Sequence, residues 1–159
     1  MLTSVQGYEA GYRLRMIVEP AALLEPSFEI NKAAFAKART QQEALLAGDM
    51  LRLSPAQLFE TNAGFHEMLL GCSGNPFLLD AVQRVNRLRR LIEYRKNQET
   101  RRLAVQCREH LQLLDLIESG DREAAASFLR QHLQQTLTIK LQREGIGFLP
   151  SPKSVAADA

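Results

Sequence analysis

Cysteine, histidine and net charge are all scarce in this chain of 159 residues. Two cysteines do not make a disulfide framework and favour a reducing, cytoplasmic environment. A formal net charge of +2 is too small to indicate nucleic acid or an anionic membrane as a partner. No apolar run approaches the roughly 20 residues of a membrane span, and residues 1–10 lack the apolar core of a signal peptide. These absences favour a cytoplasmic globular domain without membrane contact.

The apolar residues recur with a period near 3.6, the pattern of amphipathic helices, and β-branched residues are sparse. Hydrophobic residues make up 45% and charged residues 24% of the chain, as in an ordinary globular domain. The segments that interrupt this periodicity are short, as expected for loops between neighbouring helices. The sequence therefore predicts an all-α fold, an antiparallel bundle of about six helices with no strands. The helices are expected near residues 8–24, 30–47, 55–70, 76–96, 99–118 and 122–142.

Individual proline, glycine and capping residues predict where helices end and where two helices pack closely. Ser54, Pro55 and Gln57 form a capping box with proline at the first helical position. Pro20 is expected to kink or break the first helix. Gly64 is expected to mark close helix packing, because glycine in a helix interior costs about 1 kcal/mol relative to alanine. The expected divisions are a lead at 1–7, one ligand-binding domain at 8–143 and a flexible tail at 144–159.

The three histidines each lie on the apolar stripe of a different predicted helix. His66, His110 and His132 are the polar members of stripes that are otherwise largely apolar. One histidine on such a face is usually a core residue with a simple hydrogen bond. Three would all point inward by chance about 6% of the time, since an inward stripe takes roughly 40% of helix positions. A divalent transition metal would offset the cost of burying three imidazoles, so the pattern favours a metal site.

Asn62 lies one helical turn before His66 on the same face, so its amide oxygen is a candidate fourth ligand. Such a set would leave coordination positions open, unlike a closed structural zinc site built from thiolates. Imidazole suits several ions, so zinc or nickel comes first, with manganese or iron as alternatives.

Two alternative interpretations stay open. An open metal site can activate water, so one alternative is a small metalloenzyme of the helical-bundle type. A general base is missing, because no Asp or Glu lies on the three stripes and Glu109 is turned about 100° from His110. We therefore expect no catalytic residues. The other alternative is a metal-free helical interaction module.

Other reactive side chains have ordinary interpretations. Cys107, three residues before His110, could be a ligand, but free cysteine is commonly a small buried apolar residue. The arginines of the fourth predicted helix could contact phosphate. A solvated helix face is favoured, with one of Arg87 or Arg90 reaching the cavity. This arginine cluster comprises Arg84, Arg87, Arg89, Arg90 and Arg95.

Five sequence elements occur along the chain in a recognisable order. They are residues 12–20 (YRLRMIVEP), Asn62-Ala63-Gly64-Phe65-His66, Ser73-Gly74-Asn75-Pro76-Phe77-Leu78, Glu109-His110 followed by Leu113, Ile117, Gly120 and Asp121, and His132-Leu133. In these elements and their order the chain resembles the FCD domain, the effector-binding half of FadR-type GntR transcription regulators. The resemblance extends from about Tyr8 to Leu141, and the order of the elements makes it specific.

The resemblance implies an antiparallel helical bundle that holds a divalent metal ion at its centre. The family's ligands, one Asp or Asn and three His, correspond to Asn62, His66, His110 and His132. Small organic acids bind beside the metal in such domains. Arg15 matches a cavity-facing arginine that can pair with an effector carboxylate.

The resemblance also implies how such a domain acts. The first and fourth helices are the family's usual dimer surface, so a homodimer is expected. Effector binding would reset the spacing of two DNA-binding heads, which is an allosteric and not a catalytic role. The chain departs from the family in two respects, because the winged-helix domain that contacts DNA is missing and Asn62 stands where many members carry Asp. Either the domain was excised from a longer regulator or the gene has lost its DNA-binding half.

Overall fold

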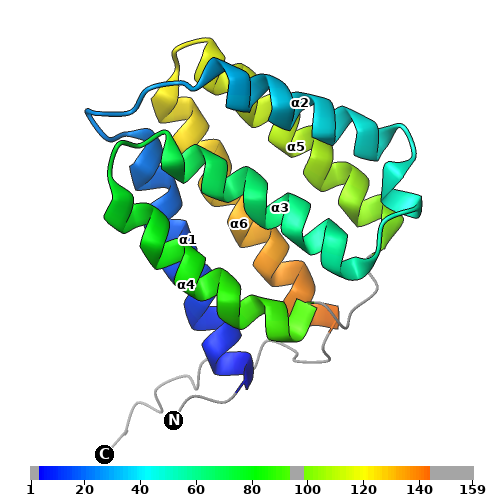
Figure 1. Cartoon of the computed structure of the whole chain (residues 1–159). Coiled ribbons are helices and arrows are strands. Elements are labelled where there is room, and N and C mark those ends of the chain that lie inside the picture. The colour runs from blue at the N-terminus through cyan, green and yellow to red at the C-terminus, as the bar shows by residue number, and fades with distance from the viewer. Residues whose placement is uncertain (1–3, 94–98, 144–159) are drawn as a thin grey trace, which may run out of the picture.

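The computed structural model describes residues 4–93 and 99–143, and Figure 1 shows that they form a helical bundle. The all-α prediction is confirmed, since the described residues contain six α-helices, one short 3-10 helix and no strand. The predicted tail at 144–159 lies outside the described residues, and the proposed domain divisions stay a prediction. The helices are α1 (Ser4–Leu23), α2 (Lys32–Leu46), η1 (Asp49–Leu51), α3 (Pro55–Gly71), α4 (Pro76–Glu93), α5 (Thr100–Glu118) and α6 (Arg122–Arg143).

The first helix differs from its prediction at both the lead and the proline. It begins at Ser4, so part of the expected lead is helical. It also continues through Pro20 to Leu23 without a break. Proline removes one backbone hydrogen bond here, but Ala22 and Leu23 are 1% and 0% exposed, so packing holds the last turn in place.

Most other helix ends follow their capping residues. The capping box of Ser54 and Gln57 is present. The Asp121 side chain accepts a hydrogen bond from the Ala124 backbone N–H at the start of α6. Gly74 has a φ of +70°, and a Cβ atom there would lie 2.8 Å from Ser27, so the turn between α3 and α4 requires glycine.

The helices pack in a closed ring, in the order α1, α6, α5, α2, α3, α4 and back to α1. Inside the ring lies an apolar core in which Leu23, Leu114 and Ile117 are at most 1% exposed. None of the described helices is long and apolar enough to span a membrane. The ring directs one face of every helix toward a common centre, where several buried polar side chains meet.

The predicted packing role of Gly64 is wrong. Gly64 is exposed, and a Cβ atom at this position would have no neighbour within 4 Å. The close approach occurs at Gly11, where a Cβ atom would lie 3.0 Å from Cγ1 of Val85. Gly11 therefore allows α1 and α4 to approach each other closely. The presence of glycine at position 64 in α3 has no steric explanation.

Candidate metal centre

The three histidines converge at the centre of the bundle. His66 on α3, His110 on α5 and His132 on α6 are 1%, 2% and 4% exposed. One ring nitrogen from each lies within 4.8 Å of the others, and His110 Nε2 is 3.2 Å from His132 Nε2. The described residues therefore contain a three-histidine cluster that could hold a metal ion.

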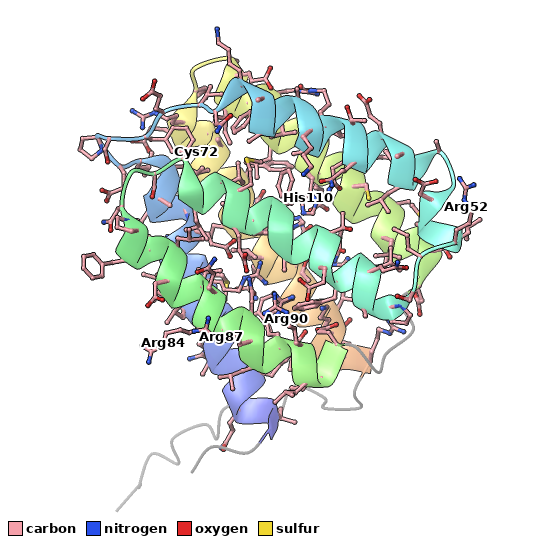
Figure 2. The ribbon with its side chains drawn as sticks, viewed as in Figure 1. Arg52, Cys72, Arg84, Arg87, Arg90 and His110 are labelled. Atoms are coloured by element: carbon pink, nitrogen blue, oxygen red, sulfur yellow. The ribbon has the colours of Figure 1, made fainter. Side chains whose placement is uncertain are left out.

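Helical periodicity explains why these side chains meet. On α5, His110 shares a buried stripe with Leu103, Cys107 and Leu114, as the sequence predicts. The ring of His110 also stacks on Phe65, with centroids 4.1 Å apart and an interplanar angle of 16°. Figure 2 labels His110 in the interior, between the helices that surround it. Apolar packing thus fixes the orientation of a polar ring.

Each histidine is held from behind by a side chain of another helix. His66 Nδ1 lies 2.7 Å from Oε1 of Glu19 on α1. His110 Nδ1 lies 3.0 Å from Oε1 of Gln42 on α2. His132 Nδ1 contacts the carboxylate of Glu109 on α5. Outer partners of this kind fix the tautomer and the orientation of histidines that bind metals.

The outer partners determine which ring nitrogens carry protons. A carboxylate and an amide oxygen only accept hydrogen bonds, so the Nδ1 atoms must donate. In the neutral imidazoles the Nε2 lone pairs are then free, and those of His110 and His132 face each other at 3.2 Å. Two facing lone pairs cannot form a hydrogen bond, but both can bind one cation.

Burial favours the neutral form of His66 and His110. It lowers the pKa of His66 to about 4, against the opposing effect of Glu19. Burial also lowers the pKa of His110 well below its ordinary value, and the neighbouring His132 and His66 lower it further. Neutral imidazole is the form that ligates metals, so the lowered pKa values of His66 and His110 are compatible with a metal site.

Glu19 is shared between the histidine cluster and a buried arginine. Its Oε2 accepts a hydrogen bond from Arg15 Nε at 2.8 Å. Burial raises the pKa of Glu19, but Arg15 and His66 outweigh it and lower the pKa to about 2. Arg15 is 1% exposed, and its Nη2 has no hydrogen-bond partner. Both carboxylate oxygens of Glu19 therefore have hydrogen-bond partners, whereas Nη2 of Arg15 has none.

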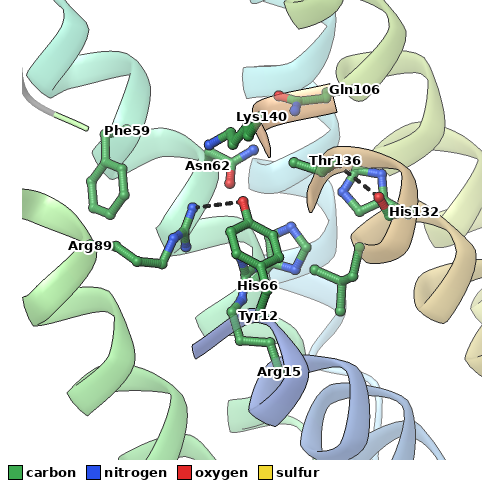
Figure 3. Close-up of a pocket in the computed structure, with 11 residues that line it drawn as sticks. Tyr12, Arg15, Phe59, Asn62, His66, Arg89, Gln106, His132, Thr136 and Lys140 are labelled. Atoms are coloured by element: carbon green, nitrogen blue, oxygen red, sulfur yellow. Dashed lines mark hydrogen bonds between the residues drawn. The ribbon is translucent and has the colours of Figure 1, made fainter. Parts of the chain in front are cut away.

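Asn62 lies on α3 at the edge of the cluster. It is half-buried and, together with His66 and His132, lines a pocket with about 320 Å³ of free space, open solvent included. It also lines a second pocket, with about 300 Å³ of free space on the same measure, that His110 borders. Figure 3 shows the Asn62 amide at the same pocket as the His66 ring. The four residues suggested as ligands thus line adjoining space.

The larger pocket has a cationic wall. Arg15, Arg89 and Lys140 line it, and Figure 3 shows Arg89 reaching the Tyr12 hydroxyl. Burial alone would raise the pKa of Tyr12, but Arg89, Lys140 and Arg15 lower it to about 7. The remaining lining residues are Phe59, Asn62, His66, Gln106, His132, Leu133 and Thr136.

The arginine that reaches the cavity is Arg89, and the expectation of Arg87 or Arg90 is wrong. Arg89 is 4% exposed, whereas Arg87 is exposed. Arg90 pairs with Glu60, and its Nε lies 2.6 Å from Oε1. Figure 2 shows Arg84 and Arg87 on the outside of α4. The buried stripe Val82, Asn86, Arg89 and Glu93, with spacing four, three and four, is the pattern that could have identified Arg89.

Sequence reasoning also missed the outer partners Glu19, Gln42 and Glu109. The sequence analysis considered only carboxylates on the three histidine stripes, whereas Glu19 and Glu109 contact histidines of other helices. The i,i+4 pair of Arg15 and Glu19 was a usable signal. Cys107 lies in an apolar cluster with Leu45, Met50, Leu58 and Leu103, as expected, and burial raises the pKa of its thiol to about 11.

Comparison with known proteins gives one match. No curated protein and no solved structure is detectably similar to the chain. The family model for the FCD domain matches residues 10–135, which include the three histidines, their outer partners, and Arg15 and Arg89 of the cationic wall. This match covers most of the chain and agrees with the helical fold. The chain therefore belongs to the FCD family, the effector-binding domains of GntR-type regulators.

Proposed function

We propose that this domain senses a small carboxylate through a divalent transition metal ion held by Asn62, His66, His110 and His132. The orientation of the imidazoles carries the proposal, because each Nδ1 is held by an outer partner and each Nε2 is left available. The 3.2 Å between two of these nitrogens suits a shared ion, since two ligands about 2.1 Å from one ion lie about 3 Å apart. The ion would supply an open coordination position for an effector oxygen.

The identity of the ion follows from the donor set. Three neutral imidazoles favour zinc or nickel, with manganese or iron as alternatives. The Asn62 oxygen is uncharged and would bind less strongly than a carboxylate, so a modest affinity is expected. Glu19 and Glu109 act from the outer layer, where each makes its histidine a better ligand.

Arg15 would bind the effector beside the metal. Its Nη2 is buried without a partner, in the pocket that His66 and His132 also line. A buried guanidinium nitrogen without a partner is unfavourable, and a carboxylate oxygen would satisfy it. The proposed effector is therefore a small organic acid that contacts the metal and Arg15 together.

The response would be a change in helix packing. Arg15 and Glu19 both belong to α1, which packs on α6, α4 and α3. α1 and α4 also expose the large apolar side chains Ile17, Leu88 and Leu91, at 66%, 68% and 72%. We propose that these residues line a homodimer interface, so that effector binding alters the geometry of the dimer. DNA would be contacted only by a winged-helix domain outside this chain.

The metal proposal is tested by elemental analysis of protein purified without added metal. We expect stoichiometric metal in the wild type and a large loss in His66→Ala, His110→Ala and His132→Ala. Cys107→Ala, one turn from His110, is the matched control and should retain the metal. Negligible metal in the wild type, with no difference between wild type and variants on metal titration, would overturn the proposal.

The effector proposal is tested by thermal shifts of metal-loaded protein with acetate, lactate and citrate. A ligand that binds only the folded state stabilises it by RT ln(1 + [L]/Kd), about 2.7 kcal/mol at 100 times Kd. Arg15→Ala and Arg15→Lys should lose most of the shift, whereas Arg13→Ala, two residues away and exposed, should keep it. An Arg15 variant that responds like the wild type would remove Arg15 from the site.

A further inference from the structure

Arg89 is a second buried cation in the pocket, and it has no carboxylate partner. It is 4% exposed, and its Nη1 donates to Asn86 Oδ1 at 2.9 Å. Its Nη2 lies 3.4 Å from the Tyr12 hydroxyl, and its Nε has no partner. Among the described residues no carboxylate forms an ion pair with Arg89; Tyr12, Tyr8, Glu93 and Glu19 raise its pKa against the effect of burial, but none of them contacts its Nε.

The nearby charges do not neutralise Arg89 directly. Lys140 lines the same pocket, but its Nζ is paired with Glu93 at 2.6 Å. Glu67 reaches Arg89 only through Asn86, whose Nδ2 donates to Glu67 Oε1 at 2.8 Å. The direct contacts of Arg89 are thus the Asn86 amide, the Tyr12 hydroxyl and the aromatic rings of Tyr12 and Phe59.

Arg89 and Arg15 lie close enough for one small molecule to contact both. Their guanidinium carbons lie 5.1 and 5.0 Å from the centre of the same Tyr12 ring. Each has one buried nitrogen without a hydrogen bond, and both line the same pocket. The two charges are therefore no farther apart than these two lengths together, which an acid of about three to five carbons with a carboxylate at each end can bridge.

We infer that Arg89 forms a second carboxylate subsite and that the effector is a short dicarboxylate. One carboxylate would bind at the metal and Arg15, and the other would accept a hydrogen bond from Arg89 Nε. The first contact rests on the proposed function, whereas the second depends on Arg89 alone. Water could satisfy the same nitrogen, but it would give no preference between a dicarboxylate and a monocarboxylate of equal length.

The test is calorimetric titration of metal-loaded wild type with malonate, succinate and glutarate, each against its matched monoacid propionate, butyrate or valerate. At least one dicarboxylate should bind about tenfold or more tightly than its match, the size expected for a hydrogen bond between two charged groups. Arg89→Gln should reduce that ratio to about threefold or less, because it weakens binding of the dicarboxylate much more than binding of the monoacid. Arg87→Gln, exposed on the same helix, should keep the wild-type ratio.

The outcomes separate the two proposals. If every matched pair binds the wild type within about threefold, or if the preference survives in Arg89→Gln, the second subsite is overturned while Arg15-dependent monoacid binding still supports the proposed function. If dicarboxylates are preferred equally without metal, the subsite stands and the metal requirement fails. If no acid of either series binds, both fail. Should Arg89→Gln not fold, the wild-type ratios decide, together with Arg89→Lys, which keeps the charge but loses the Nε donor.

Discussion

The carboxylate of Glu19 lies 2.7 Å from Nδ1 of His66, and this contact links the histidine cluster to the cationic wall of the pocket. The same carboxylate binds Arg15 through its other oxygen. Two hydrogen bonds, His66 to Glu19 and Glu19 to Arg15, therefore connect the proposed metal ligand to the proposed effector arginine. Because Glu19 belongs to α1, both events act on a helix that also packs against α4 and α6.

Replacing Glu19 should weaken metal binding without removing a ligand. We expect Glu19→Gln to lower metal affinity about 10- to 100-fold, because a neutral amide accepts the His66 Nδ1–H hydrogen bond less strongly than a carboxylate and makes the imidazole a weaker ligand. Competition with a chromophoric chelator measures the affinity. Glu9→Gln, an exposed residue on the same helix that pairs with Arg13, is the control. Equal affinities in the two variants would contradict a role for Glu19 in orienting His66.

The metal-free domain should lose stability in mild acid. The folded-state pKa of His66 is about 4, below the ordinary value of 6.5. The unfolded chain therefore binds the extra proton first, and stability falls as the pH drops from about 6.5 towards 4, by the order of 3 kcal/mol. The pKa of Glu19, lowered to about 2, extends the loss as the pH falls below about 4.5.

Urea unfolding of chelator-treated protein between pH 7.5 and 4.5 measures this loss. His66→Gln should flatten the pH dependence in the upper part of the range, since the titrating imidazole is gone. A wild-type unfolding free energy that stays constant from pH 7 to pH 5 would contradict the assignment of a buried neutral histidine.

Two glycines should respond oppositely to alanine. Gly64 is exposed inside α3 with open space around its missing Cβ, so Gly64→Ala should stabilise the fold by up to about 1 kcal/mol. At Gly11 the new methyl group would lie 3.0 Å from Val85 Cγ1, so crowding between α1 and α4 should cancel or reverse that gain. Denaturant midpoints of the two variants check the prediction, and equal stabilisation would show that Val85 moves freely.

The exposed apolar residues of α4 should control the oligomeric state. We expect the wild type to be a dimer by light scattering and Leu88→Glu and Leu91→Glu to be monomers, because a buried charge opposes association. Leu51→Glu serves as the control, since Leu51 on η1 is as exposed as Leu91, 72% in each case. A monomeric wild type, or a Leu91→Glu protein that stays dimeric, would exclude this face as the interface.

The sequence predicts the parts of the centre that depend on helical periodicity alone. His66, His110 and His132 lie on apolar stripes, and a stripe that packs inward brings its polar member with it. Capping residues such as Ser54 similarly fix a helix end through local hydrogen bonds. Neither inference requires knowing how two helices are oriented relative to each other.

The outer partners depend on tertiary geometry and were missed for that reason. Glu109 is turned away from His110 on its own helix, and this rotation points it at His132 on α6. Gln42 gave no signal, because its partner His110 is 68 residues away. Arg89 and Arg90 differ by one position, and only the rotation of α4 within the bundle decides which one enters the pocket.

The spacing of the three histidines along the chain has a further consequence. His110 and His132 are 22 residues apart, and His66 precedes His110 by twice that separation. An ion bound at this point would close two long loops at once, as a disulfide does, and long loops lose the most entropy on closure. Unlike a disulfide, this cross-link could be removed by a chelator and restored by the metal supply, so the rigidity of the domain would depend on the metal available to it.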